Sequence, residues 1–345
     1  MFERFYGLSE SPFQLSPDPS FYYGSRGHKR AYAYLQYGLQ QSEGFIVLTG
    51  EVGAGKTTLI RSLLQQLDPS RIIAAQLVST QLDADSLLRA VATAFGLVVK
   101  DYDKARLLAQ LEAFLVSLVP QGKRALLIVD EAQNLAPEAI EELRMLSNFQ
   151  LQNRALLQSF LVGQPELRQV MRGNSMRQLR QRVIASYHLG PLDHEETRAY
   201  IEHRLKHVGW KGDPTFEDGI FAPVHSFSGG IPRRINLLCN RTLLAAFLWG
   251  KHRIDVEDVN KVVAEFTEEF GDDAPGQTDV PAEMASTGRF VNGSESGRVQ
   301  DPSKLVNLEL RIIGMERTIA TTVDLLRRLI SMKRAKPVPE EREAP

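Results

Sequence analysis

The residues best suited to chemistry form one stretch, Gly50-Glu51-Val52-Gly53-Ala54-Gly55-Lys56-Thr57, with Thr58 directly after it. The stretch fits the pattern G-x-x-x-x-G-K-[ST] and follows the apolar run 45–49. A glycine loop between a strand and a helix N-terminus points backbone N–H groups at phosphate. Lys56 is then expected to reach the β and γ phosphates, and the Thr57 hydroxyl to bind Mg²⁺. Residues 50–58 therefore predict a binding site for ATP and Mg²⁺.

A pair of carboxylates, Asp130 and Glu131, follows a second apolar run at 125–129. We expect Asp130 to hold Mg²⁺ and Glu131 to polarise the attacking water. By themselves the two residues could also be a solvated strand end or cap a helix that begins at Pro137. The phosphate-binding loop upstream favours hydrolysis. Because a further strand-like run, 72–78, separates the two motifs, we expect their strands not to be neighbours in the sheet.

The elements that must position these residues follow from the hydrophobic pattern. Strands are predicted at 45–49, 72–78, 125–129, 156–162 and 187–189. Their continuous apolar character predicts a parallel sheet covered on both faces. After Pro191 the pattern predicts only helices, at 195–208, 216–227, 233–249 and 256–270. We therefore predict an α/β core over 1–191 and a helical lid over 192–270.

The composition changes at Gly271. Residues 271–303 are rich in Gly, Ser, Asp and Pro, which predicts a flexible linker. Apolar residues from Leu305 to Leu329 then recur at spacings of three and four, which favours a coiled-coil helix over 304–334. The alternative is one amphipathic helix that docks on the main domain. Residues 335–345 are predicted to be a disordered tail.

The overall composition excludes several classes of protein. The 345 residues carry 41 Lys and Arg against 42 Asp and Glu, which argues against a uniformly basic coat for nucleic acid. A single cysteine, Cys239, allows no internal disulfide and no thiol-based zinc site. The apolar runs are shorter than the about 20 residues of a spanning helix. The sequence also begins without the pattern of a secretory signal, so we expect a cytoplasmic protein.

Further short motifs carry a resemblance to a known family. They are Tyr6-Gly7-Leu8, Ser11-Pro12-Phe13, Pro17-Asp18-Pro19, Asp130-Glu131-Ala132-Gln133-Asn134-Leu135, Leu161-Val162-Gly163-Gln164-Pro165-Glu166-Leu167, Leu179-Arg180-Gln181-Arg182 and Gly229-Gly230-Ile231-Pro232-Arg233-Arg234-Ile235-Asn236. In this order, over residues 1 to about 270, they resemble the AAA+ ATPases and, within them, the family of general secretion pathway protein A. The resemblance implies a P-loop NTPase core with a helical lid, ATP hydrolysis and an ATP-dependent homo-oligomer.

Secretion members of that family continue into a membrane span and a periplasmic peptidoglycan-binding region. The present sequence is more similar to a short subfamily found with PEP-CTERM/exosortase and exopolysaccharide loci. That resemblance implies partners in envelope secretion or polysaccharide export, reached at the inner membrane through contacts. The domain also resembles transposition regulators and origin-recognition ATPases, so a DNA-associated ATPase is the alternative function.

The resemblance implies roles for three more residues. Gln164 would orient water near the γ-phosphate, although it could instead be a turn amide before Pro165. Arg182 would reach the nucleotide of a neighbouring subunit, with Arg180 as the second candidate and surface ion pairing as the alternative for both. Arg233 would contact the phosphates as the lid closes.

One helix, 26–40, interleaves basic residues with Tyr32, Tyr34 and Tyr37. Tyrosines in such a pattern could stack on single-stranded nucleic acid. We favour the interpretation that they cover the core or border the adenine pocket.

Overall fold

The computed structural model describes residues 1–270, except 79–80, 100–102, 153 and 174–175. The predicted linker, coiled-coil helix and tail therefore lie outside the described residues. All five predicted strands of the core are confirmed, as β1 (Phe45–Gly50), β2 (Ile72–Val78), β3 (Arg124–Asp130), β6 (Leu157–Gly163) and β7 (Val183–Leu189). Strand β7 begins four residues before the expected start.

The five strands form one parallel sheet in the order β2-β3-β6-β1-β7. Strand β6 separates β1 from β3, which confirms that the two motif-bearing strands are not neighbours. The separating strand is β6, whereas β2 lies at the sheet edge beyond β3. Since all strands run the same way, β1, β3 and β6 end at the same edge of the sheet, at Gly50, Asp130 and Gly163.

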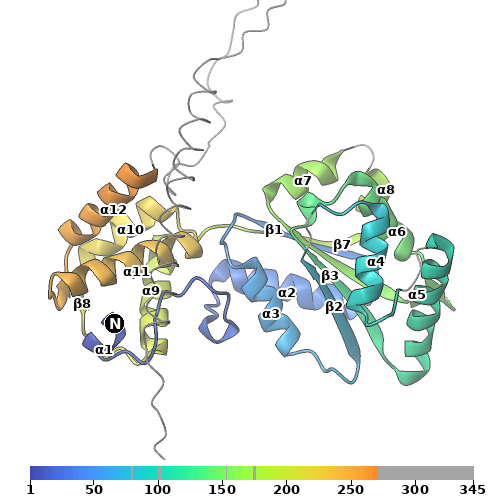
Figure 1. Cartoon of the computed structure of the whole chain (residues 1–345), viewed down its shortest axis with the longest axis horizontal. Helices are drawn as coiled ribbons and strands as arrows, with labels where there is room; N and C mark the ends of the chain where they lie inside the picture. Colours follow the sequence, from blue (N-terminus) through green and yellow to red (C-terminus); the bar gives the residue numbers. More distant parts are fainter. Residues whose placement is uncertain (79–80, 100–102, 153, 174–175, 271–345) are drawn as a thin grey trace, which may run out of the picture. The chain divides into compact units, whose positions relative to one another are not determined.

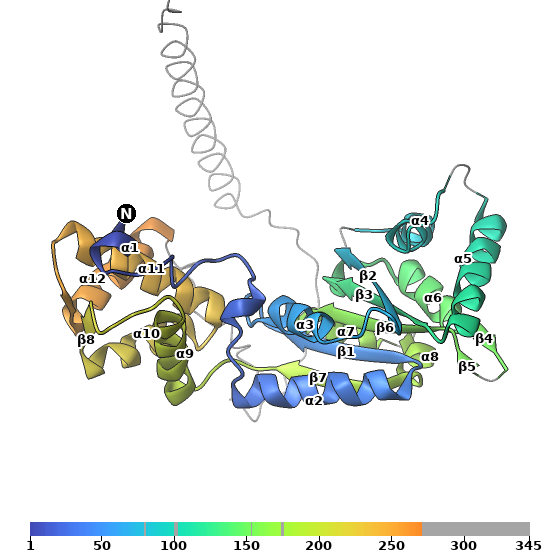
Figure 2. The same cartoon turned by 90° about the horizontal axis from the view of Figure 1, so that it is seen from below.

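Helices cover both faces of this sheet (Figures 1 and 2). One face packs against α4 (Ala84–Ala94), α5 (Lys104–Leu118), α6 (Pro137–Leu146), α7 (Pro165–Arg172) and α8 (Arg177–Arg180). The other face packs against α2 (Arg26–Gln41) and α3 (Lys56–Gln65). Along β1, Phe45 and Val47 enter the first cluster, while Ile46 and Leu48 enter the second. This two-residue alternation, buried on both sides, explains why the strands read as continuous apolar runs.

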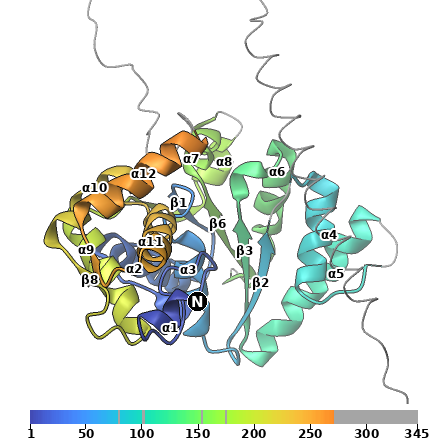
Figure 3. The ribbon, with the colours of Figure 1, turned by 60° about the vertical axis from the view of Figure 1, so that its left-hand side comes forward.

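The lid encloses a third apolar cluster. Its helices are α9 (His194–His207), α10 (Phe221–Ser228), α11 (Pro232–Leu248) and α12 (Val256–Phe270), and Figure 3 shows α10, α11 and α12 together. The lid also contains a parallel pair of two-residue strands, β8 (Thr215–Phe216) and β9 (Arg253–Ile254), where only helices were predicted. A two-residue strand is too short to show a hydrophobic period, so that part of the prediction was wrong.

The N-terminal segment packs with the lid helices, although it was expected to belong to the core. It contains α1 (Phe2–Phe5) and a 3₁₀ turn, η1 (Pro19–Phe21). Phe2, Phe13 and Phe21 are buried in the lid cluster. The buried Arg204 guanidinium of α9 donates to the Pro12 carbonyl at 2.5 Å. Apolar side chains thus decide where this segment lies, rather than its proximity to β1 in the sequence.

The remaining described elements are short. They are the 3₁₀ turns η2 (Val119–Gln121), η3 (Ala132–Asn134) and η5 (Asp218–Ile220), and the antiparallel hairpin of β4 (Gln150–Leu151) and β5 (Arg154–Ala155). No helix in the described part of the chain has both the length and the apolar character needed to cross a membrane.

Candidate active site

The loop between β1 and α3 has the geometry of a phosphate cradle. Gly53 and Gly55 have φ of +83° and +100°, in the region that favours glycine. Lys56, the first residue of α3, is buried, and its Nζ donates to the carbonyls of Gly50 at 2.6 Å and Glu51 at 3.0 Å. Burial lowers the pKa of Lys56, while the nearby Glu131 and Asp130 oppose that shift. The ammonium is therefore held by neutral carbonyls that phosphate oxygens could replace.

A histidine of α2, which no sequence pattern indicated, packs against this loop. His28 of α2 is buried, with Nδ1 2.8 Å from the Ser25 hydroxyl. A Cβ built on Gly55 would lie 2.7 Å from His28 Nε2. Burial lowers the pKa of His28, although a backbone hydrogen bond with Ala54 opposes the shift. His28 thus packs against the phosphate loop at Gly55 and holds it in place. This role depends on tertiary packing, and no sequence motif indicates it.

The end of β3 supplies oxygen ligands beside the loop. Thr57 Oγ1 donates to Asp130 Oδ2 at 3.1 Å, and the Glu131 backbone N–H donates to Asp130 Oδ1 at 3.0 Å. Asp130 is buried, and burial raises the pKa of its carboxyl in spite of these hydrogen bonds. A hydroxyl and a carboxylate side by side are ligands that Mg²⁺ prefers. The two predicted metal-binding residues therefore fit a Mg²⁺-nucleotide.

Glu131 is held by two amides. Gln133 Nε2 and Gln164 Nε2 donate to Glu131 Oε2 at 2.6 and 3.0 Å, and the Gln164 backbone N–H donates to Gln133 Oε1 at 3.0 Å. Burial raises the pKa of Glu131, but the two amides and the Lys56 ammonium outweigh it and hold the pKa below its usual value. Glu131 is thus poised as a carboxylate. Gln133 was part of a recognised motif, yet nothing in the sequence gave it this contact.

The lid touches the phosphate loop directly at the start of α11. The Arg233 backbone N–H donates to the Gly53 carbonyl at 3.1 Å. A Cβ built on Gly53 would lie 2.3 Å from the Cβ of Arg233. Gly230, with φ of +72°, forms the turn before α11, where a Cβ would lie 2.0 Å from the Leu192 carbonyl oxygen. The structure therefore brings Arg233 onto the loop, while contact of its guanidinium with phosphate stays a prediction.

A cavity of about 190 Å³ lies between loop, lid and N-terminal segment. It is lined by Gln14, Leu15, Ser16, Pro17, Asp18, Val52, Gly53, Gly55, Lys56, Thr57, Thr58, Glu131, Tyr200, Pro232, Arg233 and Asn236. An adjoining hollow of about 50 Å³ is bordered by Phe21, Tyr22, Tyr23 and His28, an aromatic setting suited to a flat base. The sequence patterns missed this N-terminal contribution. A larger cavity, of about 500 Å³, lies elsewhere and contains no residue of the two motifs.

The expected role of the tyrosines on α2 was wrong for two of them. Tyr34 and Tyr37 are 48% and 53% exposed, so they neither cover the core nor line either hollow of the site. Tyr32 is half-buried, packs against the core and donates to Gln66 Oε1. Tyr22 and Tyr23 occupy the position expected for aromatics near the base.

Comparison with known proteins agrees with this geometry. Residues 39–171 match the family model described as an AAA domain. General secretion pathway protein A of Aeromonas hydrophila is 44% identical over 261 residues, which are 75% of this chain. Residues 39–171 therefore form an AAA domain, and the chain is similar to general secretion pathway protein A over a longer stretch. The chain spans about half the length, 47%, of that curated relative.

Solved structures with the same fold support the assignment of the AAA+ architecture. Cdc6p of Pyrobaculum aerophilum has a TM-score of 0.59 and 16% identity, covering 75% of this chain and 71% of that one. A chain of Drosophila ORC bound to DNA has a TM-score of 0.54 and 18% identity, with 74% and 66% covered. Identities this low show the shared fold alone. The fold agrees with the predicted parallel-sheet core and helical lid.

Arg182 and Arg180, the two candidates to reach the nucleotide of a neighbouring subunit, do not line the nucleotide cavity of their own chain. Arg182 directly precedes β7, at the sheet edge opposite the phosphate loop, and its Nη1 donates to Ser147 Oγ at 2.7 Å. Arg180 Nη1 donates to the carbonyls of Met171 and Gly173, at the end of α7. Within the described residues neither arginine forms an ion pair. Arg180 thus caps a helix, which leaves Arg182 as the better candidate.

Proposed function

We propose that this chain is a Mg²⁺-dependent ATPase that assembles or energises a bacterial envelope secretion or exopolysaccharide-export system. The observation that carries the hydrolytic part is the convergence of Lys56, Thr57, Asp130 and Glu131 at one sheet edge, beneath the lid. The relationship to a protein named for general secretion supports the envelope part. The heptad pattern at 304–334 and the position of Arg182 support a homo-oligomer as the working form.

Binding of ATP would use groups that are already in place. The Lys56 ammonium would exchange the carbonyls of Gly50 and Glu51 for phosphate oxygens, which are stronger partners for a cation. Backbone N–H groups of 51–56 would surround the β-phosphate. Thr57 and Asp130 would hold Mg²⁺, which neutralises phosphate charge when bound. Thr58, at the edge shared by the two hollows, would lie near the sugar and base.

Hydrolysis requires a base, and Glu131 is the group available. Because Gln133 and Gln164 both donate to Oε2, Oε1 is left to accept the proton of the attacking water. The same two amides fix the carboxylate in the direction of the loop. Gln164 then serves as a positioning residue through its contact with Glu131. This arrangement links the ends of β3 and β6 to the reacting phosphate.

Two arginines would connect hydrolysis to movement. Arg233 lies on Gly53 through its backbone, so a change in the loop on loss of phosphate would be transmitted to α11 and the lid. Arg182 would stabilise charge on the transferred phosphoryl group of a neighbouring subunit. Hydrolysis would then depend on assembly.

A chromosomal Lys56→Ala substitution in the source organism tests the envelope part of the proposal. We expect protein secretion or exopolysaccharide export to fall to the level of a deletion strain, while an immunoblot shows a normal amount of the chain. Unchanged secretion and unchanged polysaccharide would refute the envelope role and leave the ATPase assignment standing.

A DNA-associated ATPase is the second candidate. Exposed Tyr34 and Tyr37 lie on the same helix as the exposed Lys29 and Arg30, a combination that suits stacking on a strand of nucleic acid. Anisotropy of labelled single-stranded and duplex DNA at 50 and 200 mM salt distinguishes the two candidates. Affinity that falls steeply with salt, together with ATPase stimulation by DNA, would favour the DNA role. Equal ATPase rates with and without DNA would exclude it.

A further inference from the structure

We propose that a second cavity of the AAA domain binds a partner peptide in which carboxylates lie next to an apolar side chain. The cavity, of about 500 Å³, lies at the amino-terminal edge of the sheet, where β3 and β6 begin. The end of α5, the β4–β5 hairpin and residues 41–43 before β1 complete it. Residues 50–58, 130 and 131 do not line it. It is therefore separate from the nucleotide site, at the opposite edge of the same sheet.

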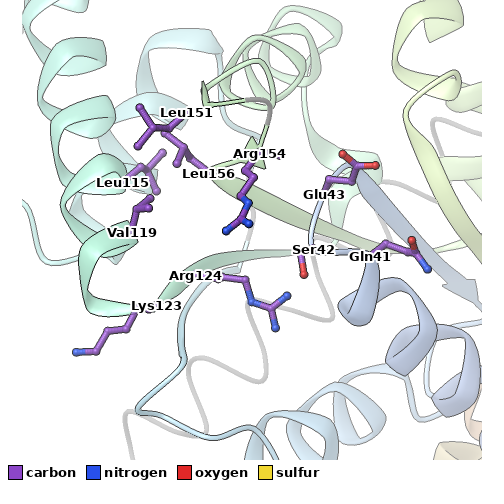
Figure 4. A pocket seen from close by; sticks show the side chains of 12 residues that line it. Gln41, Ser42, Glu43, Leu115, Val119, Lys123, Arg124, Leu151, Arg154 and Leu156 are labelled. Carbon is purple, nitrogen blue, oxygen red and sulfur yellow. The ribbon is translucent and has the colours of Figure 1, made fainter.

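The floor of this cavity is apolar. Leu115 of α5 and Leu156 before β6 are buried and form its base. Leu151 is half-buried, and Val119 is 38% exposed. Figure 4 shows these four side chains gathered on one side of the cavity. Covering such a surface with an aliphatic side chain would remove apolar area from water, which is favourable.

The open side of the cavity is cationic. Arg124, at the start of β3, and Arg154, at the start of β5, turn their guanidinium groups toward the open middle in Figure 4. Lys123 adds a third positive charge and points away from them, while Glu43 is the one carboxylate among the lining residues. None of these three cations forms an ion pair with a described residue. Arg124 Nη1 has one long hydrogen bond, to the Leu39 carbonyl at 3.4 Å.

These features together select the occupant. A guanidinium group binds a planar carboxylate through two parallel hydrogen bonds, and two such groups line this cavity beside its apolar floor. A bare inorganic anion would leave the leucine floor uncovered. A phosphate backbone would meet that same floor and the Glu43 carboxylate. A volume of about 500 Å³ is in the range of sites that enclose several side chains, which fits a short peptide segment.

The polar residues of the rim complete the fit. Gln41 and Ser42 end α2 next to the two arginines, where their side chains can hydrogen-bond a peptide backbone. Gln41, Arg124 and Arg154 are exposed, so a peptide can approach from solvent. The proposal requires no nucleotide and no hydrolysis, so it can fail while the proposed ATPase function holds.

An array of immobilised nine-residue peptides tests the proposal with the full chain. Each peptide places one or two Asp or Glu residues within three positions of Leu, Ile, Val or Phe. Matched spots carry Asn or Gln in place of the acids, or Ser in place of the apolar residue. We expect capture of the chain by the acidic and apolar spots only. The dissociation constant of the strongest binder is then measured by fluorescence anisotropy in solution.

Arg124→Glu/Arg154→Glu is the test variant, and we expect it to bind the peptide at least about tenfold more weakly. Arg106→Glu/Arg172→Glu, which makes the same charge change at exposed positions outside the cavity, should bind as the unmodified chain does. Circular dichroism confirms folding, and Arg154→Gln replaces the double variant if that one unfolds. Capture by no acidic spot, or equal affinity of the test variant, would overturn the proposal. Equal capture by the Ser spots would show that an anion alone is bound and would also overturn it.

Discussion

The contact between Gly53 and Arg233 allows a sharp test of how the lid engages the phosphate loop. In Gly53→Ala the new Cβ would start 2.3 Å from Arg233 Cβ, so α11 must retreat by about 1 Å to reach an ordinary contact of 3.4 Å. The hydrogen bond from Arg233 N–H to Gly53 O, 3.1 Å long, would then be broken. A net hydrogen bond contributes about 0.5 to 1.5 kcal/mol, and forced overpacking costs about 1 to 3 kcal/mol.

The lid can relieve the overpacking by opening. We therefore expect the substitution to destabilise the closed lid relative to the open lid by about 1 to 3 kcal/mol. If ATP binds between loop and lid, its affinity falls by about 5- to 150-fold. The assay is the fluorescence of an N-methylanthraniloyl derivative of ATP titrated with Mg²⁺ present. Gly96→Ala is the matched control, because Gly96 has φ of +81° and a Cβ there would meet no atom within 4 Å.

Both variants place alanine in the left-handed region of backbone conformation, which lowers the free energy of unfolding by about 1 to 2 kcal/mol in each. We therefore expect both variants to lower the melting temperature, Gly53→Ala at least as much as Gly96→Ala, and only Gly53→Ala to lose ATP affinity. Wild-type affinity in Gly53→Ala, or an equal loss in Gly96→Ala, would refute the coupling of lid and loop.

Further predictions concern the subunit contact, the support of the loop and the buried thiol. Co-assembled Lys56→Ala and Arg182→Ala chains should recover part of the ATPase activity that each lacks alone; no recovery in a demonstrated mixed assembly would contradict an arginine in trans. Burial lowers the pKa of His28 below its ordinary value of 6.5, so the folded chain favours the neutral imidazole. The contribution of His28 to the free energy of unfolding is therefore fully present above pH 6.5 and is lost as the pH falls. Acid titration of the melting temperature should show this loss, and an equal loss in His28→Gln would count against it. Burial raises the pKa of the Cys239 thiol to about 12, so iodoacetamide should label it only in denaturant. Rapid labelling of the folded chain would show that this part of the lid opens.

The sequence predicted the centre of the sheet well because β1, β3 and β6 are buried on both faces. Short continuous apolar runs are typical of such strands. The edge strand β2 (Ile72–Val78) also matches its predicted range, although several of its residues are exposed. Strand β7 was predicted too short, since it is an edge strand in which exposed Ser186 and His188 interrupt the apolar run. The phosphate loop and the Asp-Glu pair were found because their chemistry requires fixed residue types at fixed spacing.

The parts that escaped prediction depend on contacts between distant segments. His28 meets Gly55 across 27 positions, and Gln133 meets Gln164 across 31. The aromatic hollow near Tyr22 combines the N-terminal segment with the lid. The cationic cavity draws Arg124 and Arg154 from different strands, so neither forms a local pattern. Such sites arise from tertiary packing, and the hydrophobic pattern of a short segment contains no information about contacts with distant segments.

The central claim is that Glu131 is the base for ATP hydrolysis, and phosphate release by wild type and Glu131→Gln measures it most directly. The two chains should bind Mg²⁺-ATP with similar affinity, because Lys56, Thr57 and Asp130 are intact in both. We predict steady phosphate release by the assembled wild type and a rate lower by about 100-fold or more in Glu131→Gln. Equal phosphate release by the two chains would contradict the account.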